Sequence, residues 1–312
     1  MTHAGRIKKP SIFTRLSYTD KVFTVFNICF WVVILFVIIY PMYVIVIASI
    51  SSPEAVWRGE VFFRPIDPSL VGYRAIFGYS LLWRSYLNSI VYTVVGTTLS
   101  VFVTMMGAFA LSHKFFGKPV INFFIVFTMF FSGGLIPTFL LMRDIGLYNN
   151  PLIMILMGTV SVWNLMVART YISTSIPKEL QESAFIDGAN YFSIFFKIIL
   201  PLSSTIVAVL CIFYAVATWN DFFTGLVFLR TRTLMPLQTV LREILASLQI
   251  NQDIMSEMFT AIDDPIHQAD ALRIAEVVKY CAIVISTVPA IILYVTMQDY
   301  FRKGVMIGSI KG

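Results

Sequence analysis

The sequence predicts an all-α membrane protein with six transmembrane helices, and three observations support this prediction. Of the 312 residues, 58% are apolar and only 13% are charged, whereas an ordinary soluble domain has roughly 25% charged residues. The mean hydropathy is +0.81. Six stretches lack Asp, Glu, Lys and Arg, and each is close to or above the roughly 20 residues that cross a bilayer as a helix. Around these stretches we place spans at about 22–50, 85–112, 119–142, 147–173, 196–227 and 278–300.

A basic segment precedes the first predicted span. This span is too long for the apolar region of a signal peptide, so we interpret the span as an uncleaved anchor. The outer loop 51–84 is rich in proline and glycine and is expected to consist mostly of turns.

In the third span, the segment SGGLIP (132–137) places two glycines and a proline at bilayer depth. A loosened helix is tolerated there if it packs against protein or lines a watery cavity, and both interpretations stay open.

The second outer loop, 228–277, contains two different segments. Apolar residues from Leu237 to Leu248 recur at helical spacing, which predicts an amphipathic helix lying over the bundle. The following segment, Asn251–Arg273, is acidic and is interrupted by Pro265. It is interpreted either as a docking surface for a soluble outer partner or as a solvated loop.

The distribution of charge predicts the orientation. With a cytoplasmic N-terminus, thirteen of the 23 basic residues but only five of the 17 acidic residues lie in inner segments. We therefore expect both termini, including the tail 301–312, to be cytoplasmic. The excess of positive charge is explained by topology and by contact with anionic lipid, so no nucleic-acid partner is invoked.

No catalytic or metal-binding motif is found in the sequence. Cys29, Cys211 and Cys281 all fall in predicted spans, where they are expected to be packing residues, and the three histidines are far apart in sequence. There is no GxxxxGK[ST] phosphate loop, and the spans contain neither a nucleophile–base constellation nor a carboxylate pair. We therefore predict a transport subunit, with no catalytic residues, no metal ligands and no cofactor of its own.

A charged segment at 177–195 interrupts the apolar sequence between the fourth and fifth spans. Each Asp, Lys or Arg costs about 2.5–3.5 kcal/mol at the bilayer centre, so this segment belongs in the cytoplasm. Pro177 is expected at the first position of a short helix, which Gly188 ends by adopting a left-handed conformation. Asn190 is expected to cap the next helix, which leads into the fifth span. The residues alone leave open whether this elbow docks another protein or merely connects two spans.

The elbow resembles the EAA motif of permease subunits in bacterial binding-protein-dependent ABC importers. The matching residues are Glu182-Ser183-Ala184, Asp187-Gly188-Ala189 and Ile198-Ile199-Leu200-Pro201. Ser183 replaces the usual first alanine, and Thr205 stands where a second proline often occurs. Three further stretches, FFSGGLIPTFLLMRDIGLYNN, FYAVATWNDFF and FRKGVMIGSIKG, are similar to the polysaccharide and lipo-oligosaccharide type of the carbohydrate branch, which is related to the maltose-type permeases.

This resemblance implies the type I ABC importer permease fold with a cytoplasmic coupling helix at 177–195. It implies import of an oligosaccharide or related complex sugar by alternating access in a bacterial cytoplasmic membrane. The implied partners are a second homologous permease, a cytoplasmic ATPase dimer that binds ATP and Mg, and an extracytoplasmic sugar-binding protein. It also implies that the elbow residues Glu182, Ser183, Ala184, Asp187, Gly188 and Ala189 enter a groove on the ATPase, where Glu182 meets an arginine. The tail residues Gly308, Ser309 and Lys311 are further expected contacts with the ATPase.

Residues that contact a sugar are expected among the polar and aromatic side chains of the spans, because aromatic faces and amide or hydroxyl groups bind sugars. The candidates are Trp163, Asn164, Tyr214, Trp219 and Asn220. As the alternative interpretation, Trp219 marks the membrane interface.

An ion-coupled secondary transporter or channel without an ATPase is the competing function. Such proteins favour ionisable residues within their spans, and the six charge-free stretches offer none.

Overall fold

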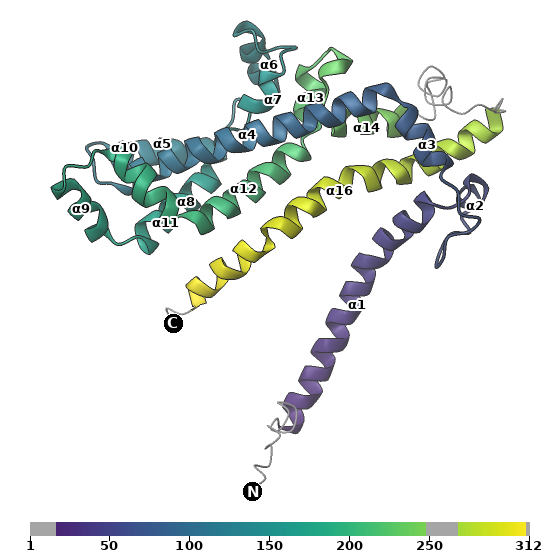
Figure 1. The fold of residues 1–312 in the computed structure, drawn as a ribbon, viewed down its shortest axis with the longest axis horizontal. Coiled ribbons are helices and arrows are strands. Elements are labelled where there is room, and N and C mark those ends of the chain that lie inside the picture. The colour runs from purple at the N-terminus through teal and green to yellow at the C-terminus, as the bar shows by residue number, and fades with distance from the viewer. Residues whose placement is uncertain (1–16, 248–267, 310–312) are drawn as a thin grey trace, which may run out of the picture.

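The computed structural model describes residues 17–247 and 268–309, and the regular elements within these ranges are all helices (Figure 1). They are α1 (Tyr18–Ser49), α2 (Pro53–Trp57), α3 (Val71–Gly78), α4 (Ser80–Ser112), α5 (Lys118–Phe130), α6 (Leu135–Asp144), α7 (Leu152–Leu156), α8 (Val162–Ser175), α9 (Lys178–Ile186), α10 (Tyr191–Ile194), the π-helix η2 (Phe195–Ile199), α11 (Leu200–Leu202), α12 (Ser204–Trp219), α13 (Phe223–Phe228), the 3-10 helix η3 (Arg232–Leu234), α14 (Leu237–Ser247) and α16 (Gln268–Ser309).

Three of the described helices are long and apolar enough to cross a membrane unbroken: α1, α4 and the part of α16 from Leu272 to Thr296. Two bent pairs bring the candidates among the described residues to five. In the first, α5 and α6 meet at 113°; in the second, Tyr191–Leu202 and α12 meet at 82°. The fourth predicted span, 147–173, is divided between α7 and α8 by the non-helical residues 157–161. By length and composition the described residues thus give up to five candidates, while the sequence predicts six.

Several helix ends differ from the predicted span boundaries. The third span, 119–142, is not one straight helix, because residues 131–134 leave the helix and Gly134 has a φ of +86°. α4 begins five residues before the predicted boundary at 85, and the outer loop 51–84 contains two short helices, α2 and α3. α16 begins ten residues before 278 and continues to Ser309, so residues 301–309 of the predicted tail extend the last helix.

α4 lies at the centre of the bundle and packs along both α12 and α8 (Figure 1). One buried cluster joins the C-terminal half of α4 to α8, to the elbow and to α12 through residues such as Met105, Ile172 and Ile194. A second cluster joins α3, α14 and the first half of α16. The two clusters stabilise opposite ends of the bundle.

The predicted amphipathic helix is observed as α14, which packs on α4 and α16. Leu237, Val240, Leu241 and Ile244 are buried, whereas Leu245 is 36% exposed and so lies at the edge of the predicted stripe. Leu248 and most of the acidic segment 251–273 lie outside the described residues.

α1 and the pair α5–α6 expose apolar surface along their length. None of the most apolar 18-residue window of α1 is buried, and neither α5 nor α6 contains a buried residue. In Figure 1, α1 diverges from the bundle after its contact with α16 near the loop that carries α2. Apolar faces of this extent are covered by lipid or by another chain.

Candidate functional site: the elbow between α8 and α12

The elbow begins with α9, and its sequence explains both ends of this helix. Pro177 precedes the helix with a φ of −59°, so the first helical residue is Lys178, one position later than predicted. Glu179 lies in the first turn, where a carboxylate interacts favourably with the positive end of the helix dipole. At the other end, Gly188 adopts a φ of +82°, the left-handed conformation that the sequence predicts.

Two backbone hydrogen bonds close the end of α9. The N–H of Gly188 donates to the carbonyl of Phe185 at 3.0 Å, and the N–H of Ala189 donates to the carbonyl of Ala184 at 2.9 Å. This pair of hydrogen bonds is the Schellman motif. Its first donor residue, here Gly188, adopts the left-handed conformation. These hydrogen bonds therefore fix the angle between α9 and the helix that follows it.

The next helix starts at the predicted cap. The side-chain oxygen of Asn190 accepts a hydrogen bond from the Ser193 N–H at 2.8 Å, and α10 begins at Tyr191. The chain continues through η2 and α11 and then bends by 82° at Ser203 before α12. Pro201 lies within this stretch and has no N–H to donate, which weakens the helical hydrogen-bonding there.

One side of the elbow is anchored in the protein. Gln181, Ile194, Phe195 and Ile199 are buried, the latter three in the cluster shared with α4 and α8. Aromatic contacts extend this anchor: the ring of Tyr191 lies 4.9 Å from Phe185 and 5.5 Å from His113 at the end of α4. These contacts attach the elbow to α4 and α8 as well as to α12.

The other side of the elbow is exposed and carries the predicted docking residues. Glu182, Ser183, Asp187 and Gly188 are exposed, and Ala184 and Ala189 are half-buried. Ile186, which the motif did not single out, is 86% exposed at the end of α9. A rigid projection with an acidic residue, small residues and one apolar side chain suits insertion into a groove on another protein.

Three of the predicted sugar-pathway residues are buried between helices. Tyr214 is hydrogen-bonded through its hydroxyl to Thr104 Oγ1 at 2.7 Å and to the Ser161 N–H at 3.1 Å. Trp219 donates its indole N–H to the Ser286 carbonyl at 3.0 Å. Asn164 is buried in the first turn of α8. The polar groups of Tyr214 and Trp219 thus already have partners within the chain.

The remaining pathway candidates are exposed. The side chain of Trp163 is 61% exposed, and Asn220 is exposed and donates to the carbonyl of Val216 at 2.9 Å. The five candidates therefore divide into a buried group and an accessible group, and Tyr214 and Trp219 belong to different buried clusters.

Of the predicted tail contacts, Gly308 and Ser309 belong to the last turn of α16, and Lys311 lies outside the described residues. Within residues 17–247 and 268–309, no group of three or more His, Cys, Asp or Glu side chains is placed to hold a metal ion.

The sequence did not predict a group of side-chain hydrogen bonds from Asn149 and Asn88, here called the polar clamp. It lies at the end of α4 that is far from the elbow. The side-chain oxygen of Asn149 accepts hydrogen bonds from the N–H groups of Arg230 and Thr231 at 3.0 and 2.9 Å, and its amide donates to the Thr231 hydroxyl at 3.0 Å. Asn88 donates to the carbonyls of Thr233 and Met235 from α4. Asn149 has a φ of +56°, which asparagine tolerates better than most residues. The Asn-Asn-Pro sequence at 149–151 is therefore the feature from which a turn at this position could have been predicted.

Comparisons with known proteins agree with this architecture. The family model for the binding-protein-dependent transport system inner membrane component matches residues 11–307. The chain is 36% identical over 275 residues to the polygalacturonan/rhamnogalacturonan transport system permease protein YtcP of Bacillus subtilis, covering 88% of this chain and 93% of that protein. It is 33% identical to Protein LplC of Bacillus subtilis, over 94% of this chain and 96% of that protein.

A solved structure shares the fold. It is the crystal structure of a bacterial ABC transporter involved in the import of the acidic polysaccharide alginate, which matches with a TM-score of 0.82 and 33% identity. The match covers 92% of this chain and 99% of the other. These comparisons confirm the predicted type I importer fold and argue against a self-sufficient secondary transporter or channel.

The chain belongs to the binding-protein-dependent transport system inner membrane component family and is a multi-pass membrane permease of an ABC importer of the sugar-transporting type, a transport component whose ATPase is a separate subunit.

Proposed function

We propose that this chain forms one half of the route by which an oligosaccharide or related complex sugar enters a bacterial cell across the cytoplasmic membrane. A second homologous permease forms the other half. A cytoplasmic ATPase dimer binds ATP and Mg, and an extracytoplasmic sugar-binding protein delivers the substrate. The observation that carries this proposal is the elbow, which is anchored on α4, α8 and α12 on one side and exposed on the other.

The elbow acts as a lever in this proposal. Glu182, Ser183, Ala184, Asp187, Gly188 and Ala189 enter a groove on the ATPase, with Glu182 against an arginine. When the ATPase closes, the elbow moves as a unit because the Schellman motif and the aromatic contacts fix its angle. The motion reaches α12 directly and α4 through their shared buried cluster, and it switches the cavity between inward-open and outward-open states.

The lever proposal also implies how the chain is oriented in the membrane. The elbow and both termini face the cytoplasm, and Gly308, Ser309 and Lys311 make further contacts with the ATPase. The excess of basic residues in the predicted inner segments supports this orientation.

The second permease is supported by the uncovered apolar faces of α1, α5 and α6. A pathway between two such subunits is lined partly by each. We keep Trp163, Asn164, Tyr214, Trp219 and Asn220 as the residues of this chain to test for the route. Trp163 and Asn220 take priority because they are exposed.

The substrate class is supported by the named relatives. One relative is a polygalacturonan/rhamnogalacturonan transport system permease protein, and the similar solved structure is an ABC transporter involved in the import of the acidic polysaccharide alginate. We therefore propose oligosaccharides from polysaccharides as the substrate class, with uronate-containing oligosaccharides as the first to test.

Affinity purification in mild detergent, combined with uptake assays, tests this function. The proposal predicts that a second permease and an ATPase co-purify with the tagged chain. It also predicts that deleting the gene abolishes uptake of a labelled oligosaccharide and that a plasmid copy restores it. Purification of the chain alone, with uptake that an ion gradient drives in the absence of ATP, would contradict the proposal.

A further inference from the structure

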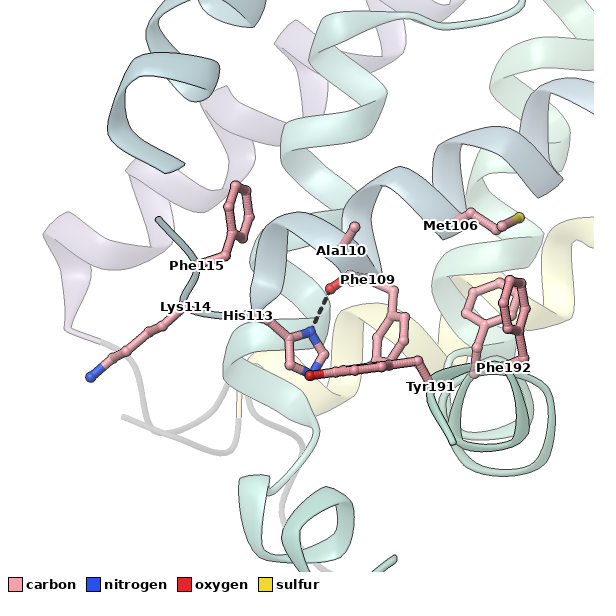
Figure 2. A pocket seen from close by; sticks show the side chains of 9 residues that line it. Met106, Phe109, Ala110, His113, Lys114, Phe115, Tyr191 and Phe192 are labelled. Atoms are coloured by element: carbon pink, nitrogen blue, oxygen red, sulfur yellow. Dashed lines mark hydrogen bonds between the residues drawn. The ribbon is translucent and has the colours of Figure 1, made fainter. Parts of the chain in front are cut away.

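A mainly apolar pocket lies between the last turns of α4 and the second half of the elbow, formed by α10 and the start of η2 (Figure 2). Its volume is about 310 Å³. The lining residues are Met106, Phe109, Ala110, His113, Lys114, Phe115, Tyr191, Phe192 and Phe195. None of the exposed docking residues of α9 lines this pocket. Glu182 lines a neighbouring cavity, which shares His113 and Lys114 with the pocket.

The two ends of the pocket differ in polarity. Met106 and Phe192 lie at one end in Figure 2, and Lys114 extends away from them at the other. The helix α4 is a candidate span that ends at Ser112, two residues before Lys114. Met106 lies six residues before Ser112, which corresponds to about 9 Å along the helix axis, and Lys114 lies beyond the end of the helix. The pocket therefore runs from hydrocarbon depth to the level of lipid headgroups.

Lys114 is the cation that lines the polar end, and three further cations lie in the same region. Lys114 and Lys178 both line the neighbouring cavity, and Lys118 lies within electrostatic range of Lys114, Arg169 and Lys178. None of these four side chains forms an ion pair within the described part of the chain. Lys118 donates to the carbonyls of His113 and Ser112, which orients its ammonium toward the end of α4. Glu182 is the acidic residue that lines the same cavity.

From this arrangement we propose that the pocket binds an anionic phospholipid, with an acyl chain along Met106, Phe109, Phe192 and Phe195 and the phosphate beside Lys114. The apolar length suits an acyl chain, and the cluster of Lys114, Lys118, Arg169 and Lys178 suits the charge of the headgroup. A soluble protein would match the cations but has no means of filling a pocket that extends into the depth of the span. Because Phe195 also belongs to the elbow's anchor, the bound lipid contacts the lever and supports it.

Native mass spectrometry of the purified importer complex tests this proposal, with phosphatidylglycerol or phosphatidylcholine added to delipidated protein. The wild type is expected to bind phosphatidylglycerol more tightly than phosphatidylcholine. Lys114→Gln is expected to weaken phosphatidylglycerol binding by about fivefold, the effect of roughly one surface cation. Lys197→Gln removes an exposed cation of the elbow region that lines neither cavity, so its binding should equal that of the wild type.

A second variant tests the apolar end. Ala110→Trp places an indole in the pocket from an exposed position on α4 and should abolish the bound phosphatidylglycerol, whereas Val120→Trp on the exposed face of α5 should not. Equal binding of both lipids, or unchanged phosphatidylglycerol binding in both Lys114→Gln and Ala110→Trp, would overturn the proposal. Loss of the ATPase from Lys114→Gln with unchanged lipid binding would also overturn it and would assign the cations to the ATPase interface. The assay measures lipid binding directly, so its result is independent of whether the elbow docks the ATPase.

Discussion

The backbone N–H of Ala189 is hydrogen-bonded to the carbonyl oxygen of Ala184 at 2.9 Å, across the left-handed turn at Gly188. This contact sets the angle between α9 and the helix that enters the membrane. An elbow that transmits force must keep this angle, so the contact leads to the first prediction.

Gly188→Pro is expected to abolish uptake while leaving membrane insertion intact. Proline fixes φ near −65° and has no N–H, so it is incompatible with the observed φ of +82° and removes the hydrogen bond to Phe185. Uptake of labelled oligosaccharide and the amount of membrane-inserted protein are measured together. Gly117→Pro is the control, because Gly117 also has a φ of +82° but lies outside the elbow. Normal uptake by Gly188→Pro would contradict the lever model.

Glu182→Lys is expected to lower uptake by roughly tenfold or more, since breaking a docked charge pair typically costs 2 kcal/mol or more. Glu182 is exposed and lies on the proposed docking side, so the chain itself should fold normally. Uptake of labelled oligosaccharide and recovery of the ATPase with the tagged chain are measured together, and both are expected to fall.

Glu179→Lys makes the same change of charge one turn earlier on α9, at a position outside the motif. It should retain the ATPase and lose only the modest interaction with the helix dipole, about 0.5 kcal/mol. If the two variants lose the ATPase to the same extent, general charge and not the motif residue controls docking.

Tyr214→Phe is expected to destabilise the chain by about 1–2 kcal/mol. The change removes the hydroxyl that bonds to the buried Thr104 hydroxyl and to the N–H of Ser161, so both groups lose this partner. Thermal unfolding in detergent should therefore begin at a lower temperature, while the apparent KM for the sugar stays constant. A large increase in KM with unchanged stability would instead show that Tyr214 contacts the substrate.

Asn149→Gly is expected to loosen the segment that follows α13. Glycine accepts the φ of +56° but lacks the amide that bonds to Arg230 and Thr231, so only the side-chain clamp is removed. Trypsin should then cleave after Arg230 several times faster than in the wild type. Asn150→Gly is the control, because Asn150 bonds to the N–H of Leu152 and not to this segment. Equal cleavage rates in all three proteins would show that Asn149 does not hold the segment.

Much of the elbow was predictable because local interactions determine it. A charged segment does not enter hydrocarbon, Gly188 is a residue suited to a left-handed turn, and Asn190 is a common cap. The structure confirms the turn and the cap, and it moves the start of α9 by one residue.

Other features depended on contacts between distant parts of the chain. The sequence did not predict that Tyr191 packs between Phe185 and His113, or that Tyr214 and Trp219 find hydrogen-bond partners on other helices. The 113° bend between α5 and α6 was only partly indicated by Gly133 and Gly134, because composition shows that a helix is weakened there but does not give the angle. Long apolar stretches likewise predict the existence of spans better than their ends.

Site-directed cross-linking from position 186 shows whether the elbow contacts the ATPase in the assembled importer. Ile186→Cys, in a chain whose three native cysteines are replaced, puts a reactive thiol at the most exposed apolar position of α9. Inner-membrane vesicles that carry the complete importer are treated with a short thiol cross-linker, with and without ATP. The lever model predicts a cross-link between position 186 and the ATPase whose yield changes with ATP. Labelling of this thiol from the outer face, or cross-links that never include the ATPase, would contradict the model.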